Sequence, residues 1–583
     1  MPTDRNPGDI VYSGYPTSHV LNIGRNPAGK IVLQKVKHLL WGDWTSVTDY
    51  DFVASGDGAK LNPPLRPEEE VIVRQLTEAL VPVRVRGASG YMSEADIQDQ
   101  RLLEAVFVDV GQGDSALLVT PDDKKFVIDA GIADNMHLYL RWRFRGFEEA
   151  HTDFDGIIIT HPDADHYKGF ERLLKDRAVG AAYVWHNGLM ERFMIAADGK
   201  QSDREAERLG STREEDGQGY LVDLMESDAD LDRFLIEKRN WVNDRTGNPK
   251  LYPELLAWAQ AARDENGQRR FPNVSMLSTL HGEVAGGRSY VPGFGPTGPS
   301  GCVIEVLGPV VEADDSGDSR LRVYADEPRE KTTSMDLGKT KNGHSVLLKL
   351  SYRGFSLLFG GDLNSSAESF LLRHYTGLDV LGRDAAPDDE IVTAARKTFG
   401  VDVVKACHHG SADFTDQFMA ATGAVATIVS SGDEEGHAHP RSDTLGAIGY
   451  FGRGTRPLVF STELARSTRE FTRREDTPWF KAAKLEGKAG EEEDLTEKER
   501  LLKEARALWE QERITNVTVY GAINLRTDGN RVVLAYMLER PSDSRRWDVY
   551  TLEPDDEDRL TYIPVKLAEQ REARRRAMTN GEV

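Results

Sequence analysis

The chain has 583 residues, more than one ordinary domain, so we expect two or three packed units. A hydrophobic content of 39% and a charged content of 29% are typical of a soluble globular protein. The formal net charge of −23 argues against nonspecific coating of nucleic acid, which depends on a positive field. It leaves room for a nucleic-acid enzyme that has one local basic groove and bound metal ions.

Cysteine content and hydropathy favour a cytoplasmic protein. Cys302 and Cys407 are the only cysteines, so we expect no disulfide framework. The start, "MPTDRNPGDIVYSG", lacks the apolar core of a signal peptide. No stretch approaches the roughly 18 uninterrupted apolar residues of a membrane span.

Residues 1–100 are predicted to form a small β-rich domain. They contain short strand-like runs such as "KIVLQKV" and "VPVRVRG", separated by glycines. The order "LNIGRNPAGKIV", "WTSV", "GASGYMSEADI" resembles bacterial SH3-like barrels. An unrelated β-rich extension is the alternative.

Residues 101–545 are predicted to form the main domain, beginning with three buried strands. The segments "LLEAVFVDVGQGDSALLVT", "KKFVIDAG" and "FDGIIITHPDADH" are apolar runs that end in glycine or acidic residues. Ile157, Ile158 and Ile159 are consecutive and β-branched, which is typical of a strand covered on both faces. Polar residues follow directly, at the position where functional loops usually leave a rigid scaffold.

Two insertions interrupt this strand pattern. Residues 186–300 contain charged helical segments followed by a Gly/Pro-rich loop. Residues 451–513 contain an amphipathic helix, for which Thr496 and Glu499 form a capping-box signature.

A hairpin and a tail are expected after the second insertion. The hairpin turns at Asp528-Gly529. Residues 546–583 are predicted to form a mainly helical tail with a basic run at Arg574, Arg575 and Arg576. A solvated helix face explains that run better than a phosphate-binding role.

Metal-ligand residues collect at the ends of the predicted strands. Histidine and carboxylate groups suit zinc, manganese or iron, and two neighbouring ions need about six to eight such donors. Together the strand ends therefore predict a metal site. The donors are His161, Asp163, Asp165 and His166 in "THPDADH", Asp362 in "FGGDL", His408 and His409 in "KACHHGS", and His439 in "GHAHP".

These segments resemble the metallo-β-lactamase superfamily. In order, "FVDVGQGDSALL", "IDAG", "HPDADH", "EVLGP", "NGHSVLLKLSYRGFSLLFGGDL", "KACHHGS" and "HP" resemble the hydrolase domain of ComEC-type DNA-uptake proteins and their soluble relatives. The resemblance covers roughly residues 102–450 and the hairpin, apart from the insertions, and lacks the ComEC membrane channel. It implies a four-layer αββα sandwich that uses two divalent ions, zinc or manganese. In these relatives the aspartate corresponding to Asp163 is the normal residue.

The resemblance also implies how the ligands are shared. His161 and Asp163 would hold the first ion, and Asp165 and His166 the second. Asp362 would bridge the two ions. His408 would complete the second site, with His409 as a competitor or a supporting residue.

Supporting residues follow from the same resemblance. Asp129 would support the ligand loop by hydrogen bonding. Asn342 stands where the superfamily often has a histidine, so the first ion would be weakly held. His344 could replace the missing donor, although a polar residue at a strand start explains it as well. Gly111 and Gly113 permit a tight turn that would bring Asp109 and Asp114 towards the site.

An aspartate in place of an imidazole makes the first site harder, which favours manganese or magnesium over zinc. Such a site suits a phosphodiester, because an ion can bind its oxygens and lower the pKa of the attacking water. Asp165 would orient that water. By resemblance His439 would serve as general acid. Ser411 would bind phosphate, or would simply form part of a turn.

We therefore predict a metal-dependent phosphodiesterase or nuclease that acts on DNA or RNA, compatible with defence or nucleic-acid degradation. Two alternatives remain. One is a hydrolase of a small ester, lactone or β-lactam on the same fold, against which Asp163 counts. The other is a non-catalytic scaffold that binds a protein partner through the N-terminal domain or the helical insertions.

Overall fold

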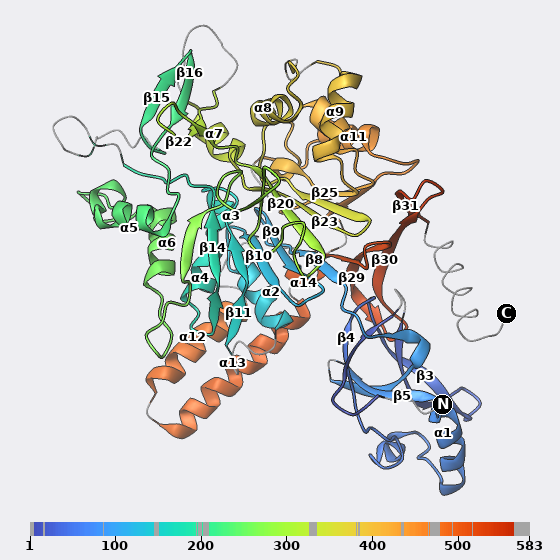
Figure 1. Ribbon diagram of the computed structural model, residues 1–583. Coiled ribbons are helices and arrows are strands. Elements are labelled where there is room, and N and C mark those ends of the chain that lie inside the picture. The colour runs from blue at the N-terminus through green and yellow to red at the C-terminus, as the bar shows by residue number, and fades with distance from the viewer. Residues whose placement is uncertain are drawn as a thin grey trace.

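The computed structural model describes residues 5–14, 18–85, 87–144, 151–193, 195, 201, 209–325, 335–380, 382, 385–432, 437–464, 466, 478–492, 494–515 and 517–564. A small N-terminal part lies beside a larger body of sheets and helices (Figure 1). Within the described residues, no helix is long and apolar enough to cross a bilayer.

The N-terminal part is built on one seven-stranded sheet in the order β3-β2-β6-β5-β4-β1-β7. One α-helix, α1 (Glu70–Thr77), connects two of its strands. The β-rich content is as predicted, and the SH3-like resemblance stays a prediction. The strands are β1 (Ile10–Ser13), β2 (His19–Arg25), β3 (Ile31–His38), β4 (Trp44–Val47), β5 (Leu80–Val85), β6 (Ala88–Ser93) and β7 (Ile97–Gln98).

The first large sheet has ten strands in the order β17-β14-β12-β10-β9-β8-β28-β29-β30-β31. Strands β10, β12, β14 and β17 run parallel to one another, and the rest pair antiparallel. The strands are β8 (Leu103–Phe107), β9 (Ser115–Val119), β10 (Lys125–Ala130), β12 (Gly156–Ile158), β14 (Tyr183–His186), β17 (Asn273–Met276), β28 (Ile523–Thr527), β29 (Val532–Ser542), β30 (Arg545–Pro554) and β31 (Leu560–Ile563).

The second large sheet has eight strands in the order β18-β19-β20-β23-β24-β25-β26-β27. Its strands β24 to β27 are parallel. The strands are β18 (Glu283–Ala285), β19 (Arg288–Tyr290), β20 (Cys302–Gly308), β23 (Leu347–Tyr352), β24 (Phe355–Phe359), β25 (Val403–Lys405), β26 (Ala426–Val429) and β27 (Leu458–Ser461).

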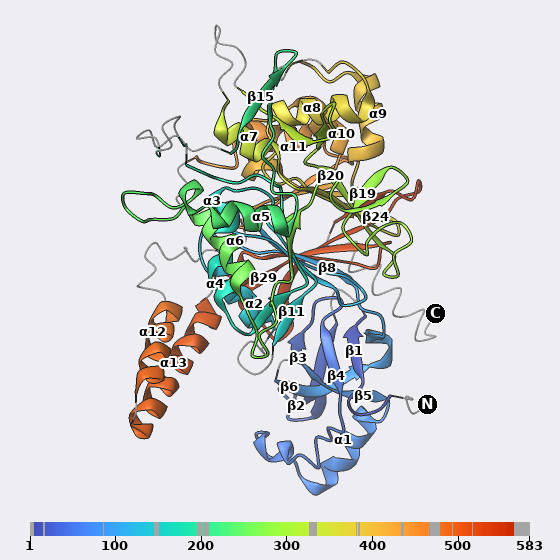
Figure 2. The same ribbon diagram turned by 60° about the vertical axis from the view of Figure 1, so that its left-hand side comes forward.

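The two large sheets share one apolar core. Phe107 of the first sheet and Phe359 of the second stack with ring centroids 5.8 Å apart. Separate clusters bury the other sheet faces under helices (Figure 2). These helices are α2 (Asn135–Arg143), α4 (Phe170–Lys175) and α6 (Leu251–Ala261) on the first sheet, and α8 (Ser365–Thr376), α9 (Asp389–Phe399) and α10 (Asp416–Thr422) on the second.

The segment 186–300 is only partly the helical insertion that the sequence predicts. Helices α5 (Asp228–Ile236) and α6 form in its charged stretches. However, β17, β18 and β19 lie within the same segment and extend the two large sheets. Since β17 pairs with β14 residue for residue, this part of the insertion belongs to the scaffold.

The predicted second insertion, residues 451–513, is wrong for its first part, because β27 pairs with β26 in the eight-stranded sheet. Its later part forms a helical hairpin of α12 (Pro478–Glu491) and α13 (Leu495–Thr515), which projects from the body (Figures 1 and 2). The predicted amphipathic helix is confirmed. Its predicted cap is wrong, because Asp494 begins the helix by accepting hydrogen bonds from the amides of Thr496 and Glu497, at 2.8 and 3.0 Å.

The predicted hairpin at Asp528-Gly529 is confirmed as β28 and β29. The prediction of a helical tail from residue 546 is wrong as far as residue 563, where β30 and β31 extend the ten-stranded sheet. The physical reason is burial: Trp547 and Leu552 contribute to cores that a detached helix would not reach. The basic run at Arg574, Arg575 and Arg576 lies outside the described residues.

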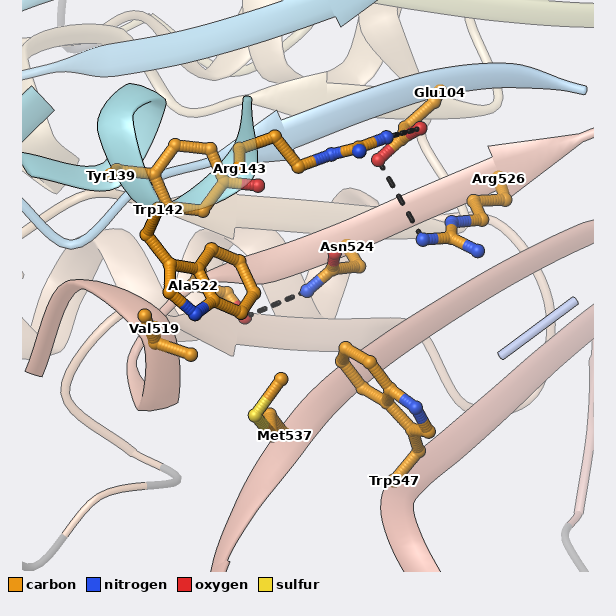
Figure 3. Close-up of a pocket in the computed structure, with 10 residues that line it drawn as sticks. All are labelled: Glu104, Tyr139, Trp142, Arg143, Val519, Ala522, Asn524, Arg526, Met537 and Trp547. Atoms are coloured by element: carbon orange, nitrogen blue, oxygen red, sulfur yellow. Dashed lines mark hydrogen bonds and ion pairs between the residues drawn. The ribbon is translucent and has the colours of Figure 1, made fainter. Parts of the chain in front are cut away.

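A buried ionic cluster joins the N-terminal part to the body. Arg526 on β28 donates to the carboxylate of Asp43 at 2.9 Å and lies 3.6 Å from Glu104 on β8. Arg143 donates to the other oxygen of Glu104 at 3.0 Å. Figure 3 shows the two arginines on either side of Glu104, in a pocket lined by Trp142 and other aromatic residues. Burial disfavours the charged carboxylate, but the two arginines outweigh it and lower the pKa of Glu104 to about 2.

Candidate metal centre

The predicted ligands meet where the two large sheets come together, beyond the ends of their strands. His161 follows β12, and Asp165 and His166 lie on the short helix α3 (Ala164–Tyr167). Asp362 follows β24, and His408 and His409 follow β25. Parallel strands of one sheet end at a common edge. The shared core brings the edges of the two sheets together, so that His161 and Asp362, about 200 positions apart in sequence, converge here.

Asp129 holds the ligand loop, as the resemblance implies. Its carboxylate accepts from the amide and the hydroxyl of Thr160 at 2.8 and 2.7 Å, and lies 2.8 Å from Nδ1 of His166. The backbone of Asp129 has φ 54°, a strained value for a residue with a side chain. These contacts turn Nε2 of His166 towards the centre.

The paired histidines, His408 and His409, differ in burial and in their contacts. His409 is buried, and its Nδ1 lies 3.2 Å from the carbonyl of Ser430 and 3.1 Å from Asp114. Its Nε2 lies 3.3 Å from Asp362 and 3.7 Å from Asp165. His408 is half-buried, with its Nε2 3.9 Å from Asp362. The geometry therefore favours His409 over His408 as a ligand.

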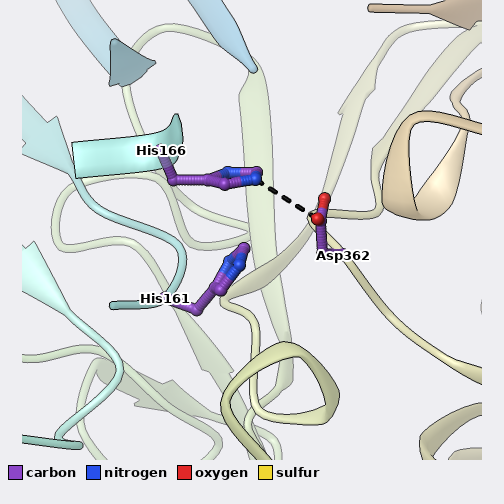
Figure 4. A group of neighbouring side chains, drawn as sticks. All are labelled: His161, His166 and Asp362. Carbon is purple, nitrogen blue, oxygen red and sulfur yellow. Dashed lines mark ion pairs between the residues drawn. The ribbon is translucent and has the colours of Figure 1, made fainter. Parts of the chain in front are cut away.

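The residues at this centre fit a divalent ion. Nε2 of His161, His166 and His409 and one oxygen of Asp362 are buried without a hydrogen-bond partner. Unpartnered buried polar atoms are costly unless something binds them. Figure 4 shows the rings of His161 and His166 facing Asp362. Ligand atoms lie within 4.8 Å of one another in the groups His161–His166–Asp362, Asp165–His166–His409 and Asp114–Asp362–His409.

The centre is strongly anionic. Burial disfavours a charged imidazole at His409, but the carboxylates of Asp362 and Asp114 outweigh it and raise the pKa of His409 to about 10. Burial opposes ionisation of the Asp362 carboxyl, but the imidazoles of His409 and His166 outweigh it and hold its pKa well below its usual range. Lys405 pairs with Asp114 and lies 4.0 Å from Asp362. The site thus attracts cations, as a metal centre must.

Asp163 has different partners. One of its oxygens lies 2.5 Å from the ammonium of Lys341, which also lies 3.3 Å from Glu191. In the amide orientation that satisfies its hydrogen bonds, Asn342 donates to the other oxygen at 2.8 Å. His161 Nε2 is 3.7 Å from this carboxylate. Burial opposes ionisation, but His161 and Lys341 outweigh it and keep the pKa of Asp163 well below its ordinary value.

Several other candidates lie beside the centre. Asp109 is fully buried and pairs with Arg466 at 2.5 Å. His344 Nε2 is 2.6 Å from the carbonyl of Arg322, which favours the structural interpretation of this residue. Ser411 caps a turn through the amide of Asp413 at 3.2 Å, in line with its turn interpretation.

His439 lies at the rim, its ring centroid 5.6 Å from that of His408. Burial, helped by the neighbouring imidazoles, lowers the pKa of His439 to about 4. At neutral pH it is therefore uncharged, a state that accepts a proton more readily than it donates one. Its general-acid role stays a prediction.

Sequence reasoning missed the two lysines and Glu191. Lys405 precedes the paired histidines in a buried strand, where a charged residue is itself a signal because buried lysine needs a partner. Lys341 adjoins Asn342 and was equally visible. Glu191 carried no signal, because only the fold brings it across from the end of β14.

Comparison with known proteins agrees with this geometry. The sequence model of the metallo-beta-lactamase superfamily matches residues 108–224, a range that contains Asp129 and the segment from His161 to His166. No curated protein matches the chain. Residues 108–224 therefore belong to a metallo-beta-lactamase superfamily domain, and this superfamily consists mainly of metal-dependent hydrolases.

Proposed function

We propose that this chain, which carries a metallo-beta-lactamase superfamily domain, is a metal-dependent phosphodiesterase that cleaves DNA or RNA. The observation that carries the proposal is the convergence of buried donor atoms without a hydrogen-bond partner on His161, His166, His409 and Asp362. They come from both large sheets, so the whole fold is needed to assemble them. Loss of these residues would have favoured a non-catalytic scaffold.

The substrate class is supported by the ligand chemistry and by the resemblance to ComEC-type hydrolase domains. A bound divalent ion, zinc or manganese, would bind a phosphate oxygen and lower the pKa of the attacking water. Asp165, His166, His409 and Asp362 would hold that ion. Asp165 would also orient the water; it is partly exposed, and Gln112 lies 3.5 Å from its carboxylate.

The finer features of the fold and its partners belong to the same proposal. We assign the main domain to the four-layer αββα sandwich, supported by one core between the two sheets and by separate cores under the helices. The projecting hairpin α12–α13 and the N-terminal sheet are the surfaces on which we expect any protein partner to bind.

The test combines metal analysis with cleavage assays. Purified chain should bind manganese or zinc and should cleave labelled single- or double-stranded DNA or RNA with added manganese. The double variant Asp165→Ala/His166→Ala should lose both properties. A matched control is His151→Ala/Asp153→Ala, which removes an exposed His–Asp pair outside the centre. Activity that survives in the first variant would refute the mechanism, and turnover of only a small phosphodiester would narrow the substrate.

A further inference from the structure

The ammonium of Lys341 occupies the space between two carboxylates on the first-ion side of the centre. It lies 2.5 Å from Asp163 and 3.3 Å from Glu191. The lysine and glutamate side chains are only 11% and 10% exposed, so water screens this arrangement weakly. A single cation between two carboxylates is also the arrangement that a metal ion would adopt.

Both carboxylate oxygens of Asp163 already have partners, so they are poorly available to a metal ion. Lys341 contacts one of its oxygens and the Asn342 amide donates to the other at 2.8 Å. Asn342 also stands where an imidazole ligand would be needed, and an amide that donates to Asp163 turns its nitrogen, not its oxygen, towards that carboxylate. The first-ion position therefore does not fit a metal.

The second-ion position, in contrast, fits a metal ion. Its donors point their unpartnered atoms inwards, as described for His166, His409 and Asp362. Among the residues that the structure describes, each convergent group of ligand atoms includes His166 or His409. None of these groups contains Asp163, Glu191 or His408.

We propose that the centre binds one divalent ion, held by Asp165, His166, Asp362 and His409, and that the Lys341 ammonium replaces the first ion. His161 lies between the two positions, with its ring centroid 4.1 Å from that of His166 and its Nε2 3.7 Å from Asp163. The lysine reaches the site from the C-terminal turn of α7 (Leu337–Gly343), directly before Asn342. The ammonium and the amide that stands where the superfamily often has a histidine thus lie at adjacent positions of one turn.

The Lys341 ammonium is a fixed positive charge, and the single divalent ion beside it would be an exchangeable one. Lysine is a compact point charge, which suits contact with an anionic oxygen but cannot lower the pKa of a water as a metal does. The ion and the Lys341 ammonium would therefore have different duties: the ion would activate water, and the ammonium would neutralise negative charge. The inference concerns metal stoichiometry and holds whatever the substrate is.

Metal binding without substrate tests the inference. Equilibrium dialysis of the full chain against Mn²⁺, followed by elemental analysis, should give one ion per chain. The electron paramagnetic resonance spectrum of the bound Mn²⁺ should be that of an isolated ion. Two ions per chain with an exchange-coupled spectrum would overturn the inference. A chain that binds one ion but cleaves no nucleic acid would refute the proposed function alone.

Variants separate the two positions. Asp163→Asn should still bind one ion, whereas Asp362→Asn should lose tight binding; loss of an ion from Asp163→Asn would contradict the assignment. Lys341→Ala removes the blocking ammonium and leaves Asp163 and Glu191 for a second ion, so its count should rise from one towards two. Lys341→Arg keeps the charge and should stay at one. A Lys341→Ala chain that is folded by circular dichroism but still binds only one ion would contradict the blocking role.

Discussion

A β-carbon built on Gly113 would stand 1.7 Å from the carbonyl oxygen of Asp165. The glycine loop that begins at Asp109 thus lies directly against the loop that carries Asp165 and His166. Gly113 also has φ 105°, which side chains rarely adopt. Glycine is required at position 113 for two reasons: its backbone conformation and its close approach to the Asp165 carbonyl.

Gly113→Ala should therefore displace the ligand loop and lower metal affinity at least 10-fold, because ligands must be held within about 0.5 Å. Isothermal titration with Mn²⁺ measures this. Gly29→Ala is the matched control: Gly29 has φ 76° but nothing within 4 Å of the added carbon. Equal affinity losses in both variants would show that contact with Asp165 is unimportant.

Asp129→Asn should weaken metal binding about 10- to 100-fold, the usual effect of losing a group that orients a histidine ligand. The carboxylate accepts from the Thr160 amide through one oxygen and faces the Thr160 hydroxyl and His166 through the other, whereas an amide has only one oxygen and cannot keep all three contacts. Asp176→Asn is the control, because Asp176 holds His137 at 2.9 Å away from the centre. Unchanged metal affinity in Asp129→Asn would show that Asp129 is not needed to orient His166.

His409→Ala should abolish tight metal binding, while His408→Ala should retain most of it. The difference follows from the convergent ligand groups among the described residues, which include His409 and not His408. Metal content after gel filtration distinguishes the two variants. The reverse result would restore the assignment that the sequence suggested.

Glu104→Gln should destabilise the fold at neutral pH but not in acid. The folded-state pKa of Glu104, about 2, lies below the ordinary value of about 4.3, so its carboxylate stabilises the fold above that value. This stabilisation, about 3 kcal/mol, disappears as the pH falls from about 4 to 2. Denaturant unfolding should show that the difference in unfolding free energy between wild type and variant is smaller at pH 3 than at pH 7. Glu497→Gln, an exposed i,i+3 partner of Arg500, should change stability little at either pH.

The sequence predicted the parts of this molecule that depend on local pattern. Buried strands were visible as apolar runs, and the ligands as polar residues at their ends. The choice between His408 and His409 was not visible, because it depends on a backbone in which both residues have positive φ, 46° and 52°. The strands from residue 545 were missed because their partner, β29, decides them more than their own composition does.

The buried ionic cluster of Arg526, Asp43 and Glu104 affects where the chain can be truncated. Cutting after residue 100 would remove Asp43 and the carbonyl of Trp41, both of which Arg526 contacts. A guanidinium only 3% exposed would then face Glu104 without its other acceptors. The apolar surface that Leu40 and Trp41 cover on β29 would also be opened to water. The first hundred residues are therefore expected to stabilise the larger body, and a chain that lacks them should aggregate more readily than the whole chain.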